Sequence, residues 1–398
     1  MSDQHRAGGL DGQLLTPSDI GDVNRSRVLQ AFCDHGPLSR ADLAKMAGVT
    51  RATIGNIVAS LLESGLIEEG EAIQTGSVGK PGRPLWFGER AGLTGAVSIT
   101  PGTIVAALVN ARGELLDEAT STFDADGNAT AIASVVSTSL RAALPKNARE
   151  ILGIGVAVPG VCNTKTGAIL GSGPVPGIAG SKLFETLTSK FDLPVLIDND
   201  SRAQALGEKW FGRGKGVASF ASIQTGHGIG VGLVMGGVVV RGAHGEAGEA
   251  GHTAVVMDGE LCRCGLRGCW ETIATVDWLR AQATEAKLSG ASKIDAAKLT
   301  ELAKTDASAR ALLERYADNI AVGLASIAQL LSPGLFILHG DAAGGGETFR
   351  TLVEEKMRAR VFAHIGRSTD VVLSELDHRA TVLGAAGLVL SETFHLVA

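Results

Sequence analysis

One histidine and three cysteines lie close together in the second half of the chain and restrict how this segment can fold. They are His252, Cys262, Cys264 and Cys269. One imidazole and three thiolates form a complete tetrahedral shell for zinc and leave no position for a reactive water, so the ion would be structural. Gly265 and Gly268 relieve crowding where the chain must fold around the metal. Unrelated thiols that merely pack together are the alternative, which the spacing and the nearby histidine disfavour. The pattern predicts one structural zinc ion per chain.

Length and composition indicate a multi-domain protein of the cytoplasm. The chain has 398 residues, more than one hydrophobic core usually organises. Its N-terminus is polar and no apolar run is long enough to cross a bilayer, so neither a secretory signal nor a membrane span is expected. Cysteines grouped as metal ligands fit a reducing compartment. With a net charge of −6, any DNA binding must come from a local basic patch.

Two short helices joined by a tight turn are predicted near the N-terminus. Ser39 can cap a helix over residues 40–47, which Gly48 then ends. Thr50 can cap a second helix with apolar residues at helical spacing. These apolar residues are Ile54, Ile57, Val58 and Leu61. A small residue, Ala44, stands where the two helices touch, so the pattern is typical of a helix-turn-helix.

The second helix of such a motif lies in the major groove and presents polar side chains to DNA. The candidate DNA-binding residues are Thr50, Arg51, Thr53, Asn56, Lys80 and Arg83. An arginine can make two hydrogen bonds to guanine and an asparagine two to adenine, whereas threonine hydroxyls suit phosphate oxygens. Lys80 and Arg83 lie in the Gly- and Pro-rich residues 70–84, which are typical of a hairpin wing that enters the minor groove. A helical hairpin that contacts another protein is the less favoured alternative.

The chain divides into three predicted parts. Residues 1–22 form a flexible arm, residues 23–88 a winged helix-turn-helix and residues 89–398 a larger domain. From about Leu93, short β runs alternate with helices, and a glycine-rich hairpin, the cysteine cluster and a mostly helical stretch follow. The predicted fold class is therefore α/β.

The cysteine segment resembles the signature of the ROK family of repressors and sugar kinases. The matching residues are Gly248-Glu249-x-Gly251-His252 and, from Cys262 to Glu271, Cys-x-Cys-Gly-x-x-Gly-Cys-x-Glu. With a winged helix in front, the chain is similar to the NagC, Mlc and xylose-repressor branch from about Val23 to its end. The resemblance implies a two-lobed actin-like, ribonuclease-H-like sugar-kinase fold with a sugar cleft between the lobes. It also implies a homodimer or homotetramer.

A buried strand is predicted within residues 194–200, and it delivers Asn199 and Asp200 at its carboxyl edge, where α/β folds bind ligands. The resemblance implies that this pair holds a sugar and that Asp200 is the relic of the general base of the kinases. By the same resemblance three more residues complete a hydrogen-bonding ring: Glu249, His252 and Glu271. His252 would bind zinc through one ring nitrogen and a sugar hydroxyl through its other side. Such a ring suits a neutral polyol.

The residues that would bind a nucleotide depart from the pattern of the kinases that the chain resembles. Those kinases begin their first lobe with Asp-x-Gly-Gly-Thr, whereas residues 97–103 read Val-Ser-Ile-Thr-Pro-Gly-Thr. Ser98 lacks the carboxylate that helps to position metal-bound phosphates in those kinases. Pro101 replaces a glycine that lets the backbone come close to the phosphates. In those kinases the region near the adenosine of ATP contains consecutive glycines, which residues 338–341 of this chain lack. The glycine hairpin at 225–230 is retained, but a tight hairpin needs such glycines in any case. These departures predict a sensor with an eroded nucleotide site, not an enzyme.

Together these features predict a sugar-responsive DNA-binding transcription regulator. It would repress genes of carbohydrate uptake or catabolism, bind double-stranded operator DNA and be released by a sugar or sugar derivative. Two alternatives stay open. One is an ATP-dependent sugar kinase with an appended DNA-binding module, which Asp200 favours and Ser98 and Pro101 oppose. The other is a regulator controlled by a protein partner such as a sugar-transport component.

Overall fold

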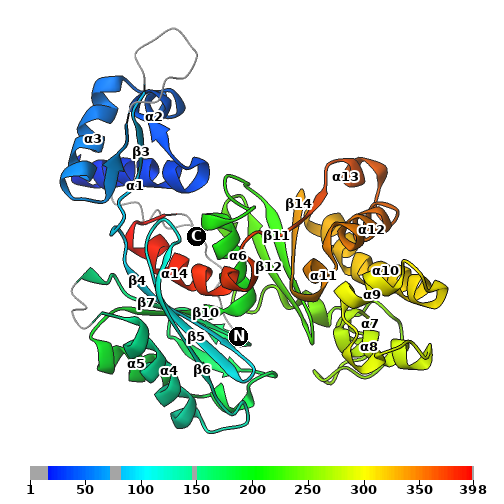
Figure 1. Ribbon diagram of the computed structural model, residues 1–398. Coiled ribbons are helices and arrows are strands. Elements are labelled where there is room, and N and C mark those ends of the chain that lie inside the picture. The colour runs from blue at the N-terminus through cyan, green and yellow to red at the C-terminus, as the bar shows by residue number, and fades with distance from the viewer. Residues whose placement is uncertain (1–16, 72–81, 146–149, 397–398) are drawn as a thin grey trace, which may run out of the picture.

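The computed structural model describes residues 17–71, 82–145 and 150–396, and it has three parts (Figure 1). We call residues 17–87 the head, residues 94–199 the first lobe and residues 218–373 the second lobe. Two helices lie between the lobes, α6 (Asp200–Phe211) and α14 (Ala380–Thr393). The predicted architecture, a winged helix-turn-helix followed by a two-lobed α/β fold, is confirmed.

The head combines three helices with a three-stranded antiparallel sheet of order β1-β3-β2. In chain order its elements are α1 (Pro17–His35), β1 (Leu38–Ser39), α2 (Arg40–Ala47), α3 (Arg51–Glu63), β2 (Ile67–Glu69) and β3 (Pro84–Phe87). Ser39 caps α2 in a capping box with Asp42, and Gly48 ends it with a φ of 64°. Thr50 caps α3 by accepting from the N–H of Thr53. Both predicted helices and their caps are confirmed.

Helix α1 corrects part of the predicted N-terminal arm. The expectation of a flexible arm up to residue 22 is wrong for residues 17–22, because α1 already begins at Pro17. Val28 and Phe32 bury the later turns of α1 in the core of the head. Extending a formed helix is much easier than nucleating one, so polar residues continue it without an apolar pattern of their own. Residues 1–16 of the expected arm lie outside the described residues.

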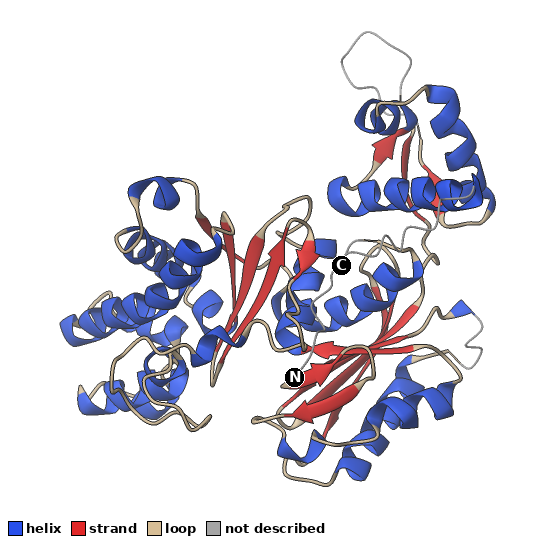
Figure 2. Ribbon diagram, turned by 180° about the vertical axis from the view of Figure 1, so that it is seen from behind, coloured by secondary structure: helices blue, strands red, loops and turns tan. Residues whose placement is uncertain are grey.

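The two lobes contain sheets of the same topology (Figure 2). The strands of the first lobe are β4 (Thr94–Thr100), β5 (Thr103–Val109), β6 (Leu115–Thr122), β7 (Ile154–Val158) and β10 (Val195–Asn199). Those of the second are β11 (Phe220–Thr225), β12 (Ile229–Met235), β13 (Val238–Val239), β14 (Leu335–His339) and β15 (Asp370–Leu373). The orders are β6-β5-β4-β7-β10 and β13-β12-β11-β14-β15. In each sheet the first three strands are antiparallel and the last two join in parallel. This duplication is the ribonuclease-H-like arrangement that the resemblance implies.

Helices cover both sheets, and a small hairpin, β8 (Val161–Asn163) with β9 (Ala168–Gly171), completes the first lobe. The helices of the first lobe are α4 (Ala129–Ala143) and α5 (Leu183–Phe191). Those of the second are α7 (Glu271–Ala274), α8 (Val276–Glu285), α9 (Ala296–Leu302), α10 (Ala307–Leu331), α11 (Gly340–Gly344), α12 (Gly346–Arg358) and α13 (Ala363–Arg367). None of the described helices is long and apolar enough to cross a membrane.

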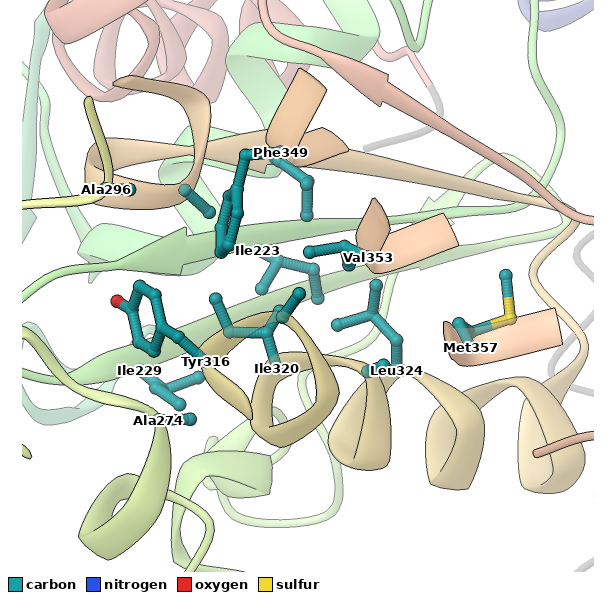
Figure 3. Close-up of a cluster of buried hydrophobic side chains, with 14 of the residues drawn as sticks. Ile223, Ile229, Ala274, Ala296, Tyr316, Ile320, Leu324, Phe349, Val353 and Met357 are labelled. Atoms are coloured by element: carbon teal, nitrogen blue, oxygen red, sulfur yellow. The ribbon is translucent and has the colours of Figure 1, made fainter. Parts of the chain in front are cut away.

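The second lobe has its core between its sheet and helices α10 and α12 (Figure 3). Ile223 of β11 faces Ile320 of α10 and Val353 of α12, and all three are fully buried. The rings of Tyr316 and Phe349 stack with their centroids 5.4 Å apart. This close-packed apolar layer fixes α10 and α12 against the sheet of the second lobe.

The helices α6 and α14 approach each other so closely that their backbones touch. A Cβ atom on Gly384 would lie 1.6 Å from the carbonyl oxygen of Ala203, and one on Gly207 would lie 2.1 Å from that of Ala380. Any larger side chain at either glycine would force the helices apart. Because α14 also packs on β4 and β7, and α6 on β12, this pair of helices connects the two lobes.

Candidate functional site

The four predicted zinc ligands converge in the structure. The ligand atoms of His252, Cys262, Cys264 and Cys269 all lie within 4.8 Å of one another. Sγ of Cys262 lies 3.6 Å from Nδ1 of His252, and Sγ of Cys264 lies 3.7 Å from Sγ of Cys269. Zinc–sulfur bonds of about 2.3 Å at a tetrahedral angle place two sulfur atoms roughly 3.8 Å apart. The donor atoms and their spacing therefore fit a tetrahedral zinc ion.

The chain around these ligands turns sharply at two glycines. Gly265 and Gly268 have φ values of 89° and 71°, which other residues rarely adopt. A Cβ atom on Gly268 would also lie 1.9 Å from the carbonyl oxygen of Val256. The predicted crowding is confirmed at Gly268, whereas a Cβ atom on Gly265 would meet no atom of the described residues within 4 Å and only the backbone conformation favours glycine there. Arg263, between the first two cysteines, donates from Nη2 to Oε1 of Glu271 at 3.0 Å. This hydrogen bond holds the segment that carries the cysteines, residues 262–269, against the start of α7.

Asn199 and Asp200 follow one another at the carboxyl end of β10, as the sequence predicts. Oδ1 of Asn199 accepts hydrogen bonds from the backbone N–H groups of Ser201 and Arg202, at 2.9 and 3.2 Å. Its Nδ2 donates to the carbonyl oxygen of Gly160 at 3.0 Å. Asn199 is therefore the N-cap of α6, and it fixes the helical turn from which Asp200 projects.

The carboxyl group of Asp200 has a pKa raised to about 6. Enclosure by the protein is the main cause, and the nearby charge of Glu249 adds to it, while hydrogen bonds from Ser201 act in the opposite direction. The side chain is half-buried, so a ligand can still reach it. A carboxyl group that changes its protonation near pH 6 can accept from or donate to a hydroxyl. The same property suits a general base.

Glu249 and His252 lie on the same side of the short 3₁₀ helix η3 (Glu249–His252), because residues three apart eclipse in such a helix. At one end of this helix the charge of Glu249 acts on Asp200. At the other, Nδ1 of His252 lies 3.9 Å from Oε2 of Glu271. Glu271 is buried, and its Oε1 accepts from the N–H of Ile229 at 2.8 Å. The structure thus brings the five predicted sugar residues into a continuous series of neighbours, and sugar binding by them stays a prediction.

Sequence reasoning missed a buried ion cluster directly behind these residues. Oδ1 of Asp198 accepts from Nε of Arg202 at 2.7 Å, and its Oδ2 accepts from Nε of Arg241 at 2.9 Å. Asp198 and Arg202 are almost completely buried. A carboxylate within an otherwise apolar strand is the signal that indicates such partners, because a lone buried charge is very unfavourable.

The loops that would face a nucleotide are held by contacts within the protein. Oγ1 of Thr225 donates to the carbonyl oxygen of His339 and accepts from the N–H of Ala342, both at 2.8 Å. A Cβ atom on Gly230 would lie 2.1 Å from Oγ of Ser201, so this glycine is needed where β12 packs on α6. The retained threonine and glycine thus have a packing role, whatever the loop binds.

Helix α3 exposes the polar side chains that the sequence assigns to DNA. Arg51, Thr53 and Asn56 are exposed, whereas Ile54 and Val58 on the opposite side are buried. The Thr50 hydroxyl accepts from the N–H of Thr53 at 3.2 Å. This cap leaves Arg51 and Asn56 as the side chains with free reach toward base edges, and base contact stays a prediction.

The described residues contain only the base of the predicted wing. Strands β2 and β3 pair antiparallel, as a wing requires, while Lys80 lies outside the described residues. Arg83 is exposed, and its Nη1 lies 3.5 Å from Oε2 of Glu69. Glu69 also pairs with Arg40. A phosphate that binds Arg83 must therefore compete with Glu69.

The head, the duplicated ribonuclease-H-like lobes and the cysteine cluster define a sugar-kinase-like protein with an appended helix-turn-helix. The ROK family model matches residues 94–392, and the MarR family model matches residues 15–75. The chain belongs to the ROK family.

Some known proteins match nearly the whole chain, and others match about three quarters of it. It is 29% identical over 390 residues to a putative xylose repressor of Caldicellulosiruptor sp. (strain Rt8B.4), covering 94% of this chain and 96% of the relative. It is 29% identical over 300 residues to a glucokinase of Thermotoga maritima, covering 72% of this chain and 94% of that enzyme. A solved ROK family transcriptional regulator, described as a homolog of the Escherichia coli MLC protein, superposes with a TM-score of 0.76 at 25% identity. That comparison covers 94% of this chain and 99% of the other. Similarity to regulators thus includes the head.

Proposed function

We propose that the chain is a sugar-responsive repressor that binds double-stranded operator DNA and controls genes of carbohydrate uptake or catabolism. Helix α6 is the observation that carries this proposal. Its first residue, Asp200, belongs to the predicted sugar site, and its last turn packs on the DNA-binding head. A helix of 12 residues spans about 18 Å, so one rigid element joins the two sites.

Contacts between aromatic rings support this link. The ring of Trp210, near the end of α6, lies 6.3 Å from that of Phe87 in β3, which in turn lies 6.1 Å from Phe32 of α1. Nε1 of Trp210 donates to Oγ of Ser391 in α14 at 3.0 Å. The three aromatic side chains belong to one hydrophobic cluster that continues from the head into the lobes. A close-packed interior transmits displacements, so a shift of α6 changes the position of the head.

The sugar acts as an inducer in this proposal. The half-sites of an operator lie about one helical turn apart, so a homodimer or homotetramer must hold two recognition helices at that distance. A ligand at Asp200 favours one arrangement of the lobes and moves the helices out of register. A typical coupling of about 1–3 kcal/mol would weaken operator binding roughly 5- to 150-fold.

The sugar ligands in this proposal are Asn199, Asp200, Glu249, His252 and Glu271. One structural zinc ion per chain would hold the loop that carries three of them. Nδ1 of His252 is the nitrogen close to Cys262, so zinc would take Nδ1 and leave Nε2 for a sugar hydroxyl. Zinc supplies no reaction here; it orients the histidine.

ATP-dependent phosphorylation of a sugar is the second candidate, because the raised pKa of Asp200 suits a general base. Ser98 and Pro101 oppose this kinase activity. They stand where a phosphate loop has a carboxylate and a glycine that lets the backbone come close to the phosphates. An ADP-release assay with Mg-ATP separates the two candidates. Turnover that Asp200→Asn abolishes would favour the kinase.

The experiment that tests the repressor begins by selecting an operator from a random duplex library with the full chain. A thermal-shift screen, with xylose and glucose among the sugars, identifies the effector. The operator is then titrated with and without saturating sugar. Weaker binding in sugar supports the proposal, unchanged binding contradicts it, and tighter binding makes the sugar a corepressor.

A further inference from the structure

One cavity of the described residues lies away from the sugar residues, at the junction between the head and the lobes. Its volume is about 300 Å³. The head contributes α1, β3 and the turn after α1, and the rest of the wall comes from the β5–β6 turn, the end of α6 and the turn that follows α6. The lining residues are Phe32, Cys33, Gly36, Pro37, Trp86, Phe87, Ala111, Arg112, Trp210, Phe211 and Lys215. Junctions between domains are common places for ligand sites, and this volume is at the lower end of their range.

Aromatic side chains are concentrated in this wall. The whole chain has 4 tryptophans, 11 phenylalanines and 1 tyrosine, and two of the tryptophans and three of the phenylalanines line the cavity. The rings of Phe32, Phe87 and Trp210 are buried against one another, whereas those of Trp86 and Phe211 are half-buried and can offer flat apolar faces to a flat ligand. Cys33 adds to the apolar wall, because burial raises the pKa of its thiol and keeps it protonated.

Two cations lie in the same wall, and no carboxylate does. Arg112 is held in place, since its Nε donates to the carbonyl oxygen of Phe87 at 2.6 Å and its Nη2 to Glu68 at 2.7 Å. The backbone N–H of Lys215 donates to the carbonyl oxygen of Gly212, but within the described part of the chain its ammonium group has no hydrogen bond or ion pair. Its Nζ lies 3.7 Å from where a Cβ atom on Gly36 would be. An ammonium group beside an apolar wall is a ready partner for an anion.

We infer that this junction cavity is a second ligand site, which takes a small organic anion with a flat apolar body, such as an aromatic carboxylate or sulfonate. The half-buried rings of Trp86 and Phe211 stack on the flat body, and Lys215 pairs with the anionic group. Because head and lobes both supply walls, the occupant stabilises one orientation of the head. The inference concerns a site distinct from Asp200, and it does not depend on which sugar the chain recognises.

Two fluorescent probes test the site in the full chain: 8-anilino-1-naphthalenesulfonate, which is a flat anion, and the uncharged N-phenyl-1-naphthylamine. We expect saturable binding of one sulfonate per chain with quenching of tryptophan emission. Lys215→Gln and Lys215→Glu are expected to weaken the sulfonate about 10-fold or more and to leave the uncharged probe unchanged. Lys215 is exposed, so neither change threatens the fold.

Lys190→Glu is the matched control, because Lys190 is also exposed but lies on α5 in the first lobe. It changes the net charge as Lys215→Glu does and is expected to bind both probes like the parent. The inference is overturned if sulfonate binding does not saturate near one per chain, or if the two glutamate variants bind it alike. It is also overturned if Lys215→Gln weakens both probes equally, since the anion would then not be recognised.

Discussion

Arg202 and Asp198 form a buried ion pair immediately behind the predicted sugar residues. Nε of Arg202 lies 2.7 Å from Oδ1 of Asp198, and their side chains are only 2% and 1% exposed. Nη1 of Arg202 also donates to the carbonyl oxygens of Gly245 and Ala247, at 2.8 and 3.3 Å. The pair therefore fastens the loop that leads to Glu249 onto the strand that leads to Asp200.

The first prediction is that Asp198→Asn destabilises the fold by about 3–5 kcal/mol, because it leaves two arginines without their shared carboxylate. Sugar affinity is expected to fall as well, since the loop before Glu249 loses its anchor. Urea unfolding and sugar titration measure the two effects. Asp318→Asn removes a partner of Arg360 from a partly exposed pair and should cost less than about 1 kcal/mol. Equal losses in both variants would contradict the assigned role of Asp198.

Zinc content provides the second prediction. Elemental analysis of the purified chain is expected to give about one zinc per chain, and Cys264→Ser is expected to lose it. Sugar binding should fall with the metal, because the loop holding Glu249, His252 and Glu271 loosens. Cys33→Ala, at a cysteine outside the cluster, should retain the zinc. A parent protein without zinc would refute the assignment.

The third prediction separates base contacts from phosphate contacts. Arg51→Ala is expected to weaken binding to the selected operator by about 1–3 kcal/mol, the usual loss for one good base contact. Arg83→Ala is expected to weaken binding to many sequences and to lower the salt dependence. Arg141→Ala, an exposed change on α4, serves as the control and should alter neither. Operator binding like that of the parent in both head variants would show that the DNA face is elsewhere.

Sugar response is the subject of the fourth prediction. Asp200→Asn and Glu249→Ala are expected to leave operator affinity without sugar nearly unchanged while abolishing its decrease in saturating sugar. Asp200 is the first residue of α6 and Glu249 lies near it on η3, so neither residue belongs to the end of α6 that meets the head. Glu185→Ala, at an exposed glutamate of α5, should keep the full response. A normal sugar response in either site variant would exclude that residue from the site.

The fifth prediction concerns pH. The carboxyl group of Asp200 ionises near 3.8 in the unfolded chain and near 6 in the folded one, so the folded state binds this proton more tightly. Its contribution to stability is fully present below pH 3.8 and is lost as the pH rises to about 6. Asp200→Asn cannot ionise, so it should raise the free energy of unfolding relative to the parent above pH 6 and much less at pH 4. Urea unfolding across this range tests it, and a difference independent of pH would contradict the raised pKa.

Local patterns predicted much of the head and of the metal cluster. The helix over residues 40–47, the caps at Ser39 and Thr50 and the convergence of the zinc ligands depend on residues a few positions apart. Interactions of that range are encoded by spacing alone. The start of α1 escaped prediction for the opposite reason, because its first turns carry no apolar pattern and depend on the packing of later ones.

Spacing and motif were enough to determine helices α2 and α3 with their caps, and they predicted the four zinc donors and the residues of the proposed sugar and DNA sites. Only the tertiary structure decided that Trp210, at the end of α6, packs on Phe87 of the head, and that Arg241 reaches Asp198. It alone also formed the cavity between Phe32 and Lys215. These contacts join residues far apart in the chain, and they depend on two sheets and two helices packing to within van der Waals distance. No local periodicity encodes such an approach, because it results from the combined shape of side chains drawn from separate elements.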